Sequence, residues 1–154
     1  DSETTANIGL IQGGTAVNVV CPYVKLRCEA RSTDVAKLDA QIDHMVQAFE
    51  AAARKRGAIA VIDHERHYMA YHIDSGTKVV QVAQRASANL GFDGALRTTL
   101  GGSDANVFNT KGVPSIVVAT GMDKIHTHDE CVSRKDLVAT ASLVRELVKE
   151  AAKV

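Results

Sequence analysis

Two extended stretches separated by a glycine turn occupy the first thirty residues, and hydrophobic and polar positions alternate in the second of them, which predicts an antiparallel hairpin. A stretch from residue 6 to residue 12 ends at Gly13-Gly14, and a second extended stretch runs to about residue 31. The two glycines supply a turn signal between the stretches. In the second stretch apolar or small residues alternate with charged ones (Val24, Leu26, Cys28 and Ala30 against Lys25, Arg27, Glu29 and Arg31). A period of two is typical of a strand with one buried and one wet face.

A long amphipathic helix is predicted next. Apolar residues recur at spacings of three or four (Val35, Leu38, Ile42, Met45, Phe49 and Ala52) and so share one side of a helix. Asp34 precedes this run as the N-cap, and Gly57 ends it. Further extended segments are expected near residues 59–61 and 67–71, before a linker at Asp74-Ser75-Gly76. We therefore expect a first domain over residues 1–73.

The pattern changes after the linker. Helices are predicted at about 77–90, 103–111 and 134–152, and short apolar strands at about 95–99 and 115–119. Helices that alternate with continuously apolar strands are typical of an α/β layer with a largely parallel sheet. A sheet with only two or three strands cannot bury both of its faces, and we therefore expect residues 74–154 to be part of a larger α/β domain. A start at Asp1, without an initiator Met, agrees with that expectation.

Composition narrows the classes of function. Eighteen basic and eighteen acidic side chains cancel in 154 residues, so no long-range positive field would attract nucleic acid. No apolar run approaches the roughly 20 residues that cross a bilayer, and the first residues form no signal peptide. We expect a cytoplasmic protein with neither nucleic acid nor membrane as partner. Cys21, Cys28 and Cys131 form no CxxC pair, so reduced thiols are expected.

The strongest local set of chemical groups is the loop that follows the last predicted strand. His126, His128, Asp129, Glu130 and Cys131 lie within six positions. In α/β sheets ligands gather beyond the carboxyl ends of strands, and imidazole and carboxylate are common zinc ligands. A solvated loop with a surface histidine pair is the alternative interpretation.

A second candidate is Gly101-Gly102-Ser103-Asp104, between a predicted strand and a helix. Two glycines let backbone N–H groups approach a ligand, and the positive end of a helix favours an anionic group. The segment matches neither a dinucleotide fingerprint nor a Walker loop. A tight turn followed by an N-cap is the alternative.

The charged face of the early strand is a third candidate, with Asn18 upstream and Arg31 at its end. An arginine fork suits the capture of a carboxylate such as a peptide C-terminus. A salt-bridged sheet edge is the alternative. The cluster His64-Glu65-Arg66-His67 misses the HExxH spacing by one residue and is interpreted as a solvated turn.

Five motifs, taken in order, resemble the tripeptidase T branch of the zinc exopeptidase family, which also includes glutamate carboxypeptidase and succinyl-diaminopimelate desuccinylase. They are Glu3-Thr4-Thr5-Ala6-Asn7-Ile8-Gly9, Gly13-Gly14-Thr15-Ala16-Val17-Asn18-Val19-Val20, Glu29-Ala30-Arg31-Ser32-x-Asp34, Gly101-Gly102-Ser103-Asp104-Ala105-Asn106 and Gly121-Met122-x-x-x-His126-Thr127. The resemblance runs over nearly the whole chain. Several motifs in the family's order are more specific than any one alone.

The resemblance implies a fold. In that family a lid domain of two helices on a four-stranded antiparallel sheet interrupts a catalytic α/β domain. Residues 1–73 resemble the later part of the lid, or dimerisation, domain, and residues 74–154 the C-terminal part of the catalytic domain. The expected class is therefore α/β: a partial α+β lid lobe, with helices on an antiparallel sheet, joined to part of a catalytic domain. The N-terminal catalytic half has no counterpart here.

The resemblance also implies site residues. His126 matches the histidine that completes the family's second zinc site. Asn18 and Arg31 match lid positions that reach the carbonyl and the terminal carboxylate of the substrate. Gly102 and Ser103 match the loop that lines the substrate pocket. The general base and the other metal ligands match no position in this sequence, so no catalytic residue is assigned.

The implied function is that of a zinc-dependent metallopeptidase similar to tripeptide aminopeptidases. In the family two zinc ions polarise the scissile carbonyl and activate a bridging water. One histidine ligand cannot support that chemistry, so we expect the chain to be inactive alone, with short peptides as substrates and a homodimer through the lid. At Leu100 a third glycine is common in the family, and at His128 a small residue is usual, which leaves the role of His128 open.

Two other hypotheses remain from the sequence. The chain could be a non-catalytic lid or dimerisation module, or His126, His128 and Cys131 could form a mononuclear zinc site. The sequence does not separate aminopeptidase, dipeptidase and amidohydrolase chemistry, and it does not name the peptides.

Overall fold

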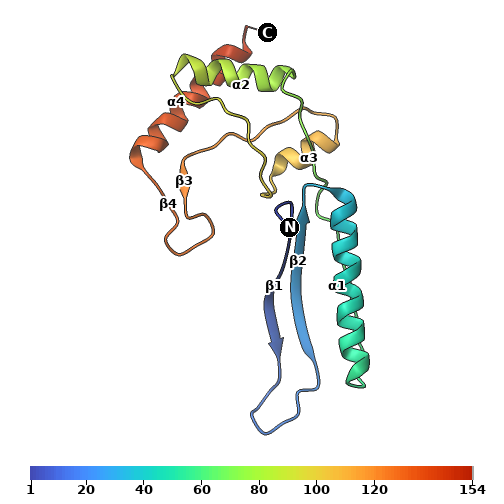
Figure 1. The fold of residues 1–154 in the computed structure, drawn as a ribbon. Coiled ribbons are helices and arrows are strands. Elements are labelled where there is room, and N and C mark those ends of the chain that lie inside the picture. The colour runs from blue at the N-terminus through green and yellow to red at the C-terminus, as the bar shows by residue number, and fades with distance from the viewer. Residues whose placement is uncertain (154) are drawn as a thin grey trace. The chain divides into compact units, whose positions relative to one another are not determined.

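The computed structural model describes residues 1–153 and divides into two compact units, one from Asp1 to Ala70 and one that begins at Tyr71. The first unit contains two strands and one helix, and the second contains three helices and two very short strands (Figure 1). This mixture of helices and antiparallel strands confirms the predicted fold class. The assignment of residues 1–73 and 74–154 to a lid and to part of a catalytic domain stays a prediction.

The first unit is built on an antiparallel hairpin of β1 (Thr4–Gly13) and β2 (Val24–Ser32). The register pairs Thr4 with Ser32 at one end and Gly13 with Val24 at the other, with a bulge between Ile8 and Leu10. The hairpin predicted from the two extended stretches around Gly13-Gly14 is therefore confirmed. Residues 14–23 form the connecting loop beyond the Gly13 end.

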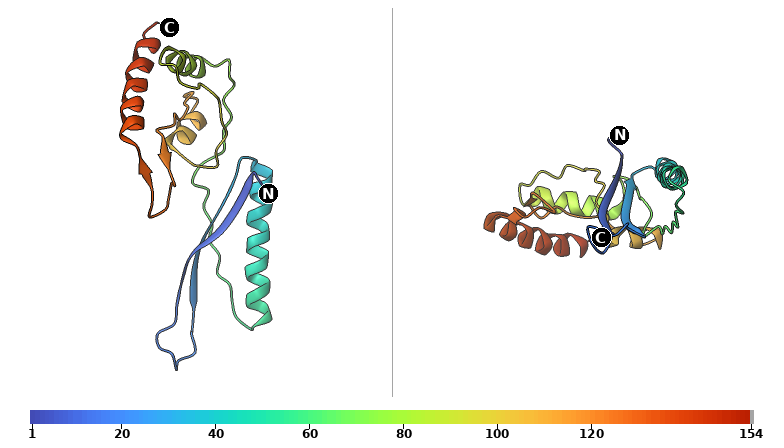
Figure 2. Two further views of the ribbon diagram at one scale, coloured as in Figure 1. Left: turned by 60° about the vertical axis from the view of Figure 1, so that its left-hand side comes forward. Right: turned by 90° about the horizontal axis from the view of Figure 1, so that it is seen from below.

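Helix α1 (Val35–Lys55) lies along the hairpin, on the side of β2 (Figures 1 and 2). Asp34 caps it, because its Oδ1 atom accepts the N–H of Lys37 at 2.9 Å. Gly57 follows the helix with a φ of 66°, in the left-handed region that favours glycine. Both predicted ends of this helix are confirmed.

The segment after α1 contains no strand up to Ala70. Arg66 in this segment forms an ion pair with Asp39 of α1 and so ties the segment back to the helix. The extended segments predicted at 59–61 and 67–71 are not paired in a sheet.

The second unit contains α2 (Lys78–Asn89), α3 (Asp104–Thr110) and α4 (Arg134–Ala151), each within two residues of its predicted bounds. Ser133 caps α4 by accepting the N–H of Asp136 at 3.0 Å. The strands predicted at 95–99 and 115–119 are wrong, because neither segment is paired in a ladder in the described part of the chain. A strand needs a hydrogen-bonded neighbour, and a local apolar pattern cannot supply one. Instead β3 (Met122–Asp123) pairs with β4 (Cys131–Val132).

Helices α2 and α4 lie side by side (Figures 1 and 2). Val80 and Ala86 of α2 and Leu143 of α4 are buried. Removing such apolar surface from water is the main favourable contribution to helix packing. This pair of helices forms the centre of the second unit.

A carboxylate is also buried between these two helices. Glu150 of α4 is only 4% exposed, and it accepts hydrogen bonds from Asn89 at 3.0 Å and from Arg85 at 3.3 Å. A further hydrogen bond, from Lys153, is the main reason why the pKa of Glu150 lies below its usual value, and it outweighs the opposite effect of burial. Glu150 is therefore charged at neutral pH. Its charge is compensated by Arg85 and Asn89 from α2 and by Lys153 after α4, as a buried charge requires.

Few apolar residues of the described chain are buried, and all of them belong to the second unit: Val80, Ala86, Ala105 and Leu143. In contrast, large apolar side chains stand open to solvent in both units, including Val17, Val20, Ile59 and Val117. Exposed apolar surface of this extent marks contact surface rather than an ordinary protein exterior. Among the described residues no helix combines the length and the apolar character that crossing a membrane requires.

Candidate functional site

His126 lies in the loop between β3 and β4, where Lys124 and His126 take left-handed φ values of 51° and 64°. The Oε2 atom of Glu130 accepts the backbone N–H of His126 at 2.7 Å, and Asp129 pairs with Lys124 at 3.7 Å. The carboxylates of Asp129 and Glu130 therefore interact with other residues of the same loop and stabilise its conformation. The residue His126 is exposed, so its imidazole is open to an incoming ligand.

The described residues do not fit a complete metal centre. Across residues 1–153, no three His, Cys, Asp or Glu side chains come together in a way that could hold a metal ion. The mononuclear site proposed for His126, His128 and Cys131 is therefore wrong, because zinc needs donors that converge to about 2.0–2.3 Å. His126 can supply one ligand, and no catalytic step follows from this chain's own residues through zinc.

The loop at Gly102 and Ser103 borders a hollow of about 500 Å³. Ser103 is the N-cap residue of α3, and its N–H donates to Oδ1 of Asn106 at 2.9 Å. The hydroxyl oxygen of Ser103 is buried, and the side chains of Ser103 and Asn106 form a capping box at the start of α3. The hollow lies between α3 and the apolar segment that follows it; its lining comprises Ser103, Asp104, Ala105, Phe108, Ser115, Ile116, Val117 and Val118.

The two walls of this hollow are joined by a residue that sequence analysis missed. Asn109, near the end of α3, hydrogen-bonds with both backbone groups of Ser115. Asparagine competes with the backbone for hydrogen bonds and is therefore a poor helix former. Its place in the last turn of a short helix, six residues before an apolar run, was the available signal.

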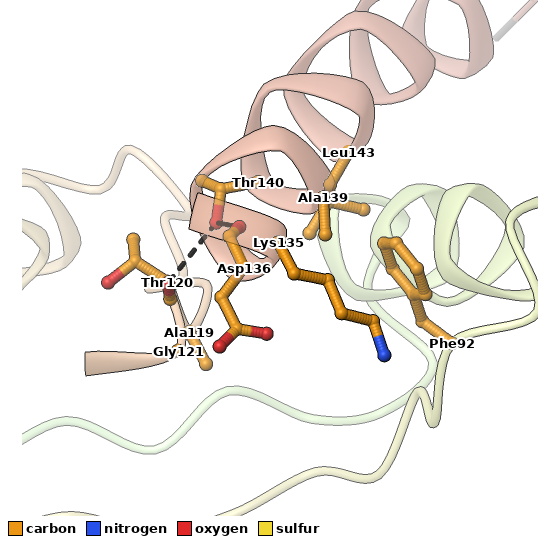
Figure 3. Close-up of a pocket in the computed structure, with 9 residues that line it drawn as sticks. All are labelled: Phe92, Ala119, Thr120, Gly121, Lys135, Asp136, Ala139, Thr140 and Leu143. Carbon is orange, nitrogen blue, oxygen red and sulfur yellow. Dashed lines mark hydrogen bonds between the residues drawn. The ribbon is translucent and has the colours of Figure 1, made fainter. Parts of the chain in front are cut away.

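A second hollow, of about 340 Å³, lies at the start of α4 (Figure 3). Lys135 extends toward Phe92, and the carboxylate of Asp136 lies near Gly121. Thr140 donates to the backbone oxygen of Thr120 at 3.3 Å and so ties α4 to the start of the His126 loop. The residues that line this second hollow are Phe92, Ala119, Thr120, Gly121, Lys135, Asp136, Ala139, Thr140 and Leu143. His126 is not among them.

Gly121, five residues before His126, allows a close approach that no other residue permits. Its φ is 77°, and a Cβ atom there would lie 2.6 Å from Cβ of Asp136. Gly112 has the same φ of 77° but has nothing within 4 Å of the added atom. The two positions therefore share their backbone strain and differ in the steric clash.

Gly121→Ala is expected to destabilise the protein by about 2 kcal/mol more than Gly112→Ala, because only the first change forces α4 away from the loop. Gly112→Ala should cost about 1 kcal/mol through its left-handed backbone alone. Urea unfolding of the two variants beside the unsubstituted chain measures the difference. Equal free energies of unfolding for the two variants would contradict the close contact with Asp136.

The predicted substrate residues of the first unit are Asn18 and Arg31. Asn18 is exposed in the hairpin loop, and Arg31 lies near the end of β2. The Nη2 atom of Arg31 donates to Oε2 of Glu29 at 2.9 Å, and this hydrogen bond raises the pKa of Arg31. The salt-bridged sheet edge named as the alternative is thus present, while Arg31 stays charged and partly exposed.

Asn18 lies in the loop beyond the Gly13–Val24 end of the hairpin, and Arg31 lies near its opposite end. Seven residue steps separate Val24 from Arg31 along β2, which is about 23 Å at strand spacing. Asn18 lies beyond the Val24 end, whereas an extended tripeptide spans only about 10 Å. One tripeptide therefore cannot contact both residues of the same copy of the chain.

Comparison with known proteins identifies the class. The model of Peptidase family M20/M25/M40 matches residues 5–150, so the chain belongs to this family. The predicted resemblance is thereby confirmed at the level of the family.

Individual relatives agree with the family. The chain is 42% identical over 153 residues to the uncharacterized protein YqjE of Bacillus subtilis (strain 168). This alignment covers 99% of the present chain and 41% of YqjE. It is similar to the crystal structure of aminopeptidase PepT from Bacillus cereus ATCC 10987, with 41% identity and a TM-score of 0.76. The match covers 99% of the present chain and 41% of the PepT chain. It is also similar to the crystal structure of a tripeptidase from Staphylococcus aureus subsp. aureus Mu50, with 39% identity and a TM-score of 0.86. This match covers 100% of the present chain and 41% of the tripeptidase chain. The chain thus spans about two fifths of the length of these relatives.

Proposed function

We propose that this chain is part of a zinc-dependent tripeptidase, in which residues 1–73 form the later part of a lid and residues 74–154 the end of the catalytic domain. The observation that carries the proposal is its similarity, over 99–100% of its length, to solved structures described as an aminopeptidase and a tripeptidase. The substrates would be short peptides with a free terminus. A cytoplasmic location and the absence of nucleic-acid and membrane partners remain predictions from the sequence.

Three residues of the second unit have proposed roles in that enzyme. Gly102 and Ser103 would line the substrate pocket, and the hollow that Ser103 lines supports this role. His126 would be one ligand of a zinc ion, and its exposed position on a loop held by Glu130 supports that role. The remaining ligands would come from outside residues 1–153, and for this reason we propose that the chain alone is inactive.

Asn18 and Arg31 of the first unit would bind the carbonyl and the terminal carboxylate of the peptide, and their separation favours a homodimer. Asn18 of one copy and Arg31 of another can meet at one site, although the two residues of one copy cannot reach the same tripeptide. Val17 and Val20 beside Asn18 are almost fully exposed, at 109% and 92%. Apolar side chains placed in this way are typical of a surface that another protein covers. The dimer would be symmetric, so that each copy gives Asn18 to one site and Arg31 to the other.

The proposal is tested with the longer protein, meaning the complete enzyme of which this chain would be a part. Its hydrolysis of an unblocked tripeptide is measured by the release of amino acids. Activity should fall on treatment with a chelator and return with zinc. Acetylation of the N-terminus or amidation of the C-terminus of the same peptide serves as the matched control. A longer protein that leaves tripeptides intact, or that cleaves doubly blocked peptides equally well, would contradict the proposal.

A further inference from the structure

The side-chain amide of Asn109 is fully engaged between two segments of the second unit. Its Nδ2 atom donates to the backbone oxygen of Ala105 at 2.7 Å and to that of Ser115 at 2.8 Å. Its Oδ1 atom accepts the N–H of Ser115 at 3.0 Å. Both hydrogens and the oxygen of one amide are therefore used, and the amide pairs with Ser115 as a neighbouring strand would.

This bridge connects the two walls of the hollow beside Ser103. Ala105 is buried and lies two residues after Ser103 in α3, and Ser115 begins the apolar segment of the opposite wall. That segment belongs to no ladder in the described chain, so the hydrogen bonds to Asn109 set its distance from α3. A shift of Ser115 would move Ile116, Val117 and Val118 with it.

We propose that Asn109 is a positioning residue that sets the width of the pocket between α3 and the segment from Ser115 to Val118. The inference rests on the proposed function, because it assumes that a short peptide binds beside Gly102 and Ser103. Asn109 itself touches neither the peptide nor the reacting atoms. Its effect on hydrolysis is therefore exerted through binding.

Three substitutions separate the possible roles. Asn109→Asp keeps the shape and the acceptor, removes both donors and places a carboxylate against two carbonyl oxygens. Asn109→Gln keeps the amide on a longer stem, so that the bridge persists with shifted walls. Gln84→Glu makes the same change from amide to carboxylate at an exposed position of α2 and is the matched control.

The experiment measures kcat and KM for a tripeptide with the longer protein, together with hydrogen exchange at the Ser115 amide. In Asn109→Asp we expect KM to rise roughly five- to tenfold, with kcat within about twofold. Exchange at Ser115 should also become faster. Asn109→Gln should give an intermediate KM, and Gln84→Glu should behave as the unsubstituted protein.

The inference is overturned by an unchanged KM in Asn109→Asp, or by a loss of kcat at constant KM. It is also overturned if both Asn109 variants unfold below the assay temperature, because Asn109 would then serve the fold alone. Failure of the unsubstituted protein to cleave tripeptides would instead sink the proposed function. In that case faster exchange at Ser115 would still support the bridge, and unchanged exchange would contradict it.

Discussion

Two inactive variants of the longer protein, Asn18→Ala and Arg31→Ala, are expected to regain tripeptide hydrolysis when they form mixed dimers. In a mixed dimer one site has lost both residues, and the other site keeps Asn18 from one copy and Arg31 from its partner. Random pairing makes half of the dimers mixed, so about one quarter of all sites are intact in a symmetric dimer. Co-expression of the two variants with different tags, followed by an assay of the dimer that carries both tags, measures this.

The control replaces Arg31→Ala by the double variant Asn18→Ala and Arg31→Ala. A mixed dimer of this double variant with Asn18→Ala has no intact site, so its activity should stay at the level of the single variants. If the first mixture also stays at that level, each site takes both residues from one copy or uses neither. The separation along β2 would then carry no functional meaning.

His126→Ala in the longer protein is expected to remove about one zinc ion per chain and to lower hydrolysis by two or more orders of magnitude. An imidazole that completes a coordination shell cannot be replaced by a methyl group, and water restores neither its geometry nor its charge distribution. Elemental analysis of the purified variant measures the metal independently of activity.

His128→Ala is the matched control, because it removes an exposed histidine from the same loop. It should keep its zinc, and its activity should stay within about twofold, as is usual for a surface change. Loss of zinc in His128→Ala but not in His126→Ala would contradict the assignment of the ligand. Loss in both would show that the loop supplies two donors.

Local signals in the sequence predicted the helices well. Asp34, Gly57 and Ser133 mark helix ends by side-chain capping or by a left-handed backbone, and such effects depend on a few neighbouring residues. The hairpin was predictable for the same reason, because Gly13-Gly14 separates two stretches that pair directly. The paired strands expected at 95–99 and 115–119 were not found, because pairing depends on partners remote in the sequence.

The candidate site was predictable only in part. Motif resemblance picked out Gly102, Ser103 and His126, and the structure adds a hollow that Ser103 lines. The distance between Asn18 and Arg31 required the hairpin register, which alternation alone does not give. Asn109 escaped notice because its importance comes from contact with Ser115 and not from its residue type.

The measurement that tests the central claim most directly is a zinc titration of the 154-residue chain by calorimetry, with tripeptide hydrolysis assayed on the same sample. A hydrolytic centre needs several converging ligands, and the described residues provide no such group. We therefore predict neither tight stoichiometric zinc binding nor hydrolysis by this chain, and both in the longer protein. Stoichiometric zinc binding together with tripeptide hydrolysis by the 154-residue chain would contradict the account.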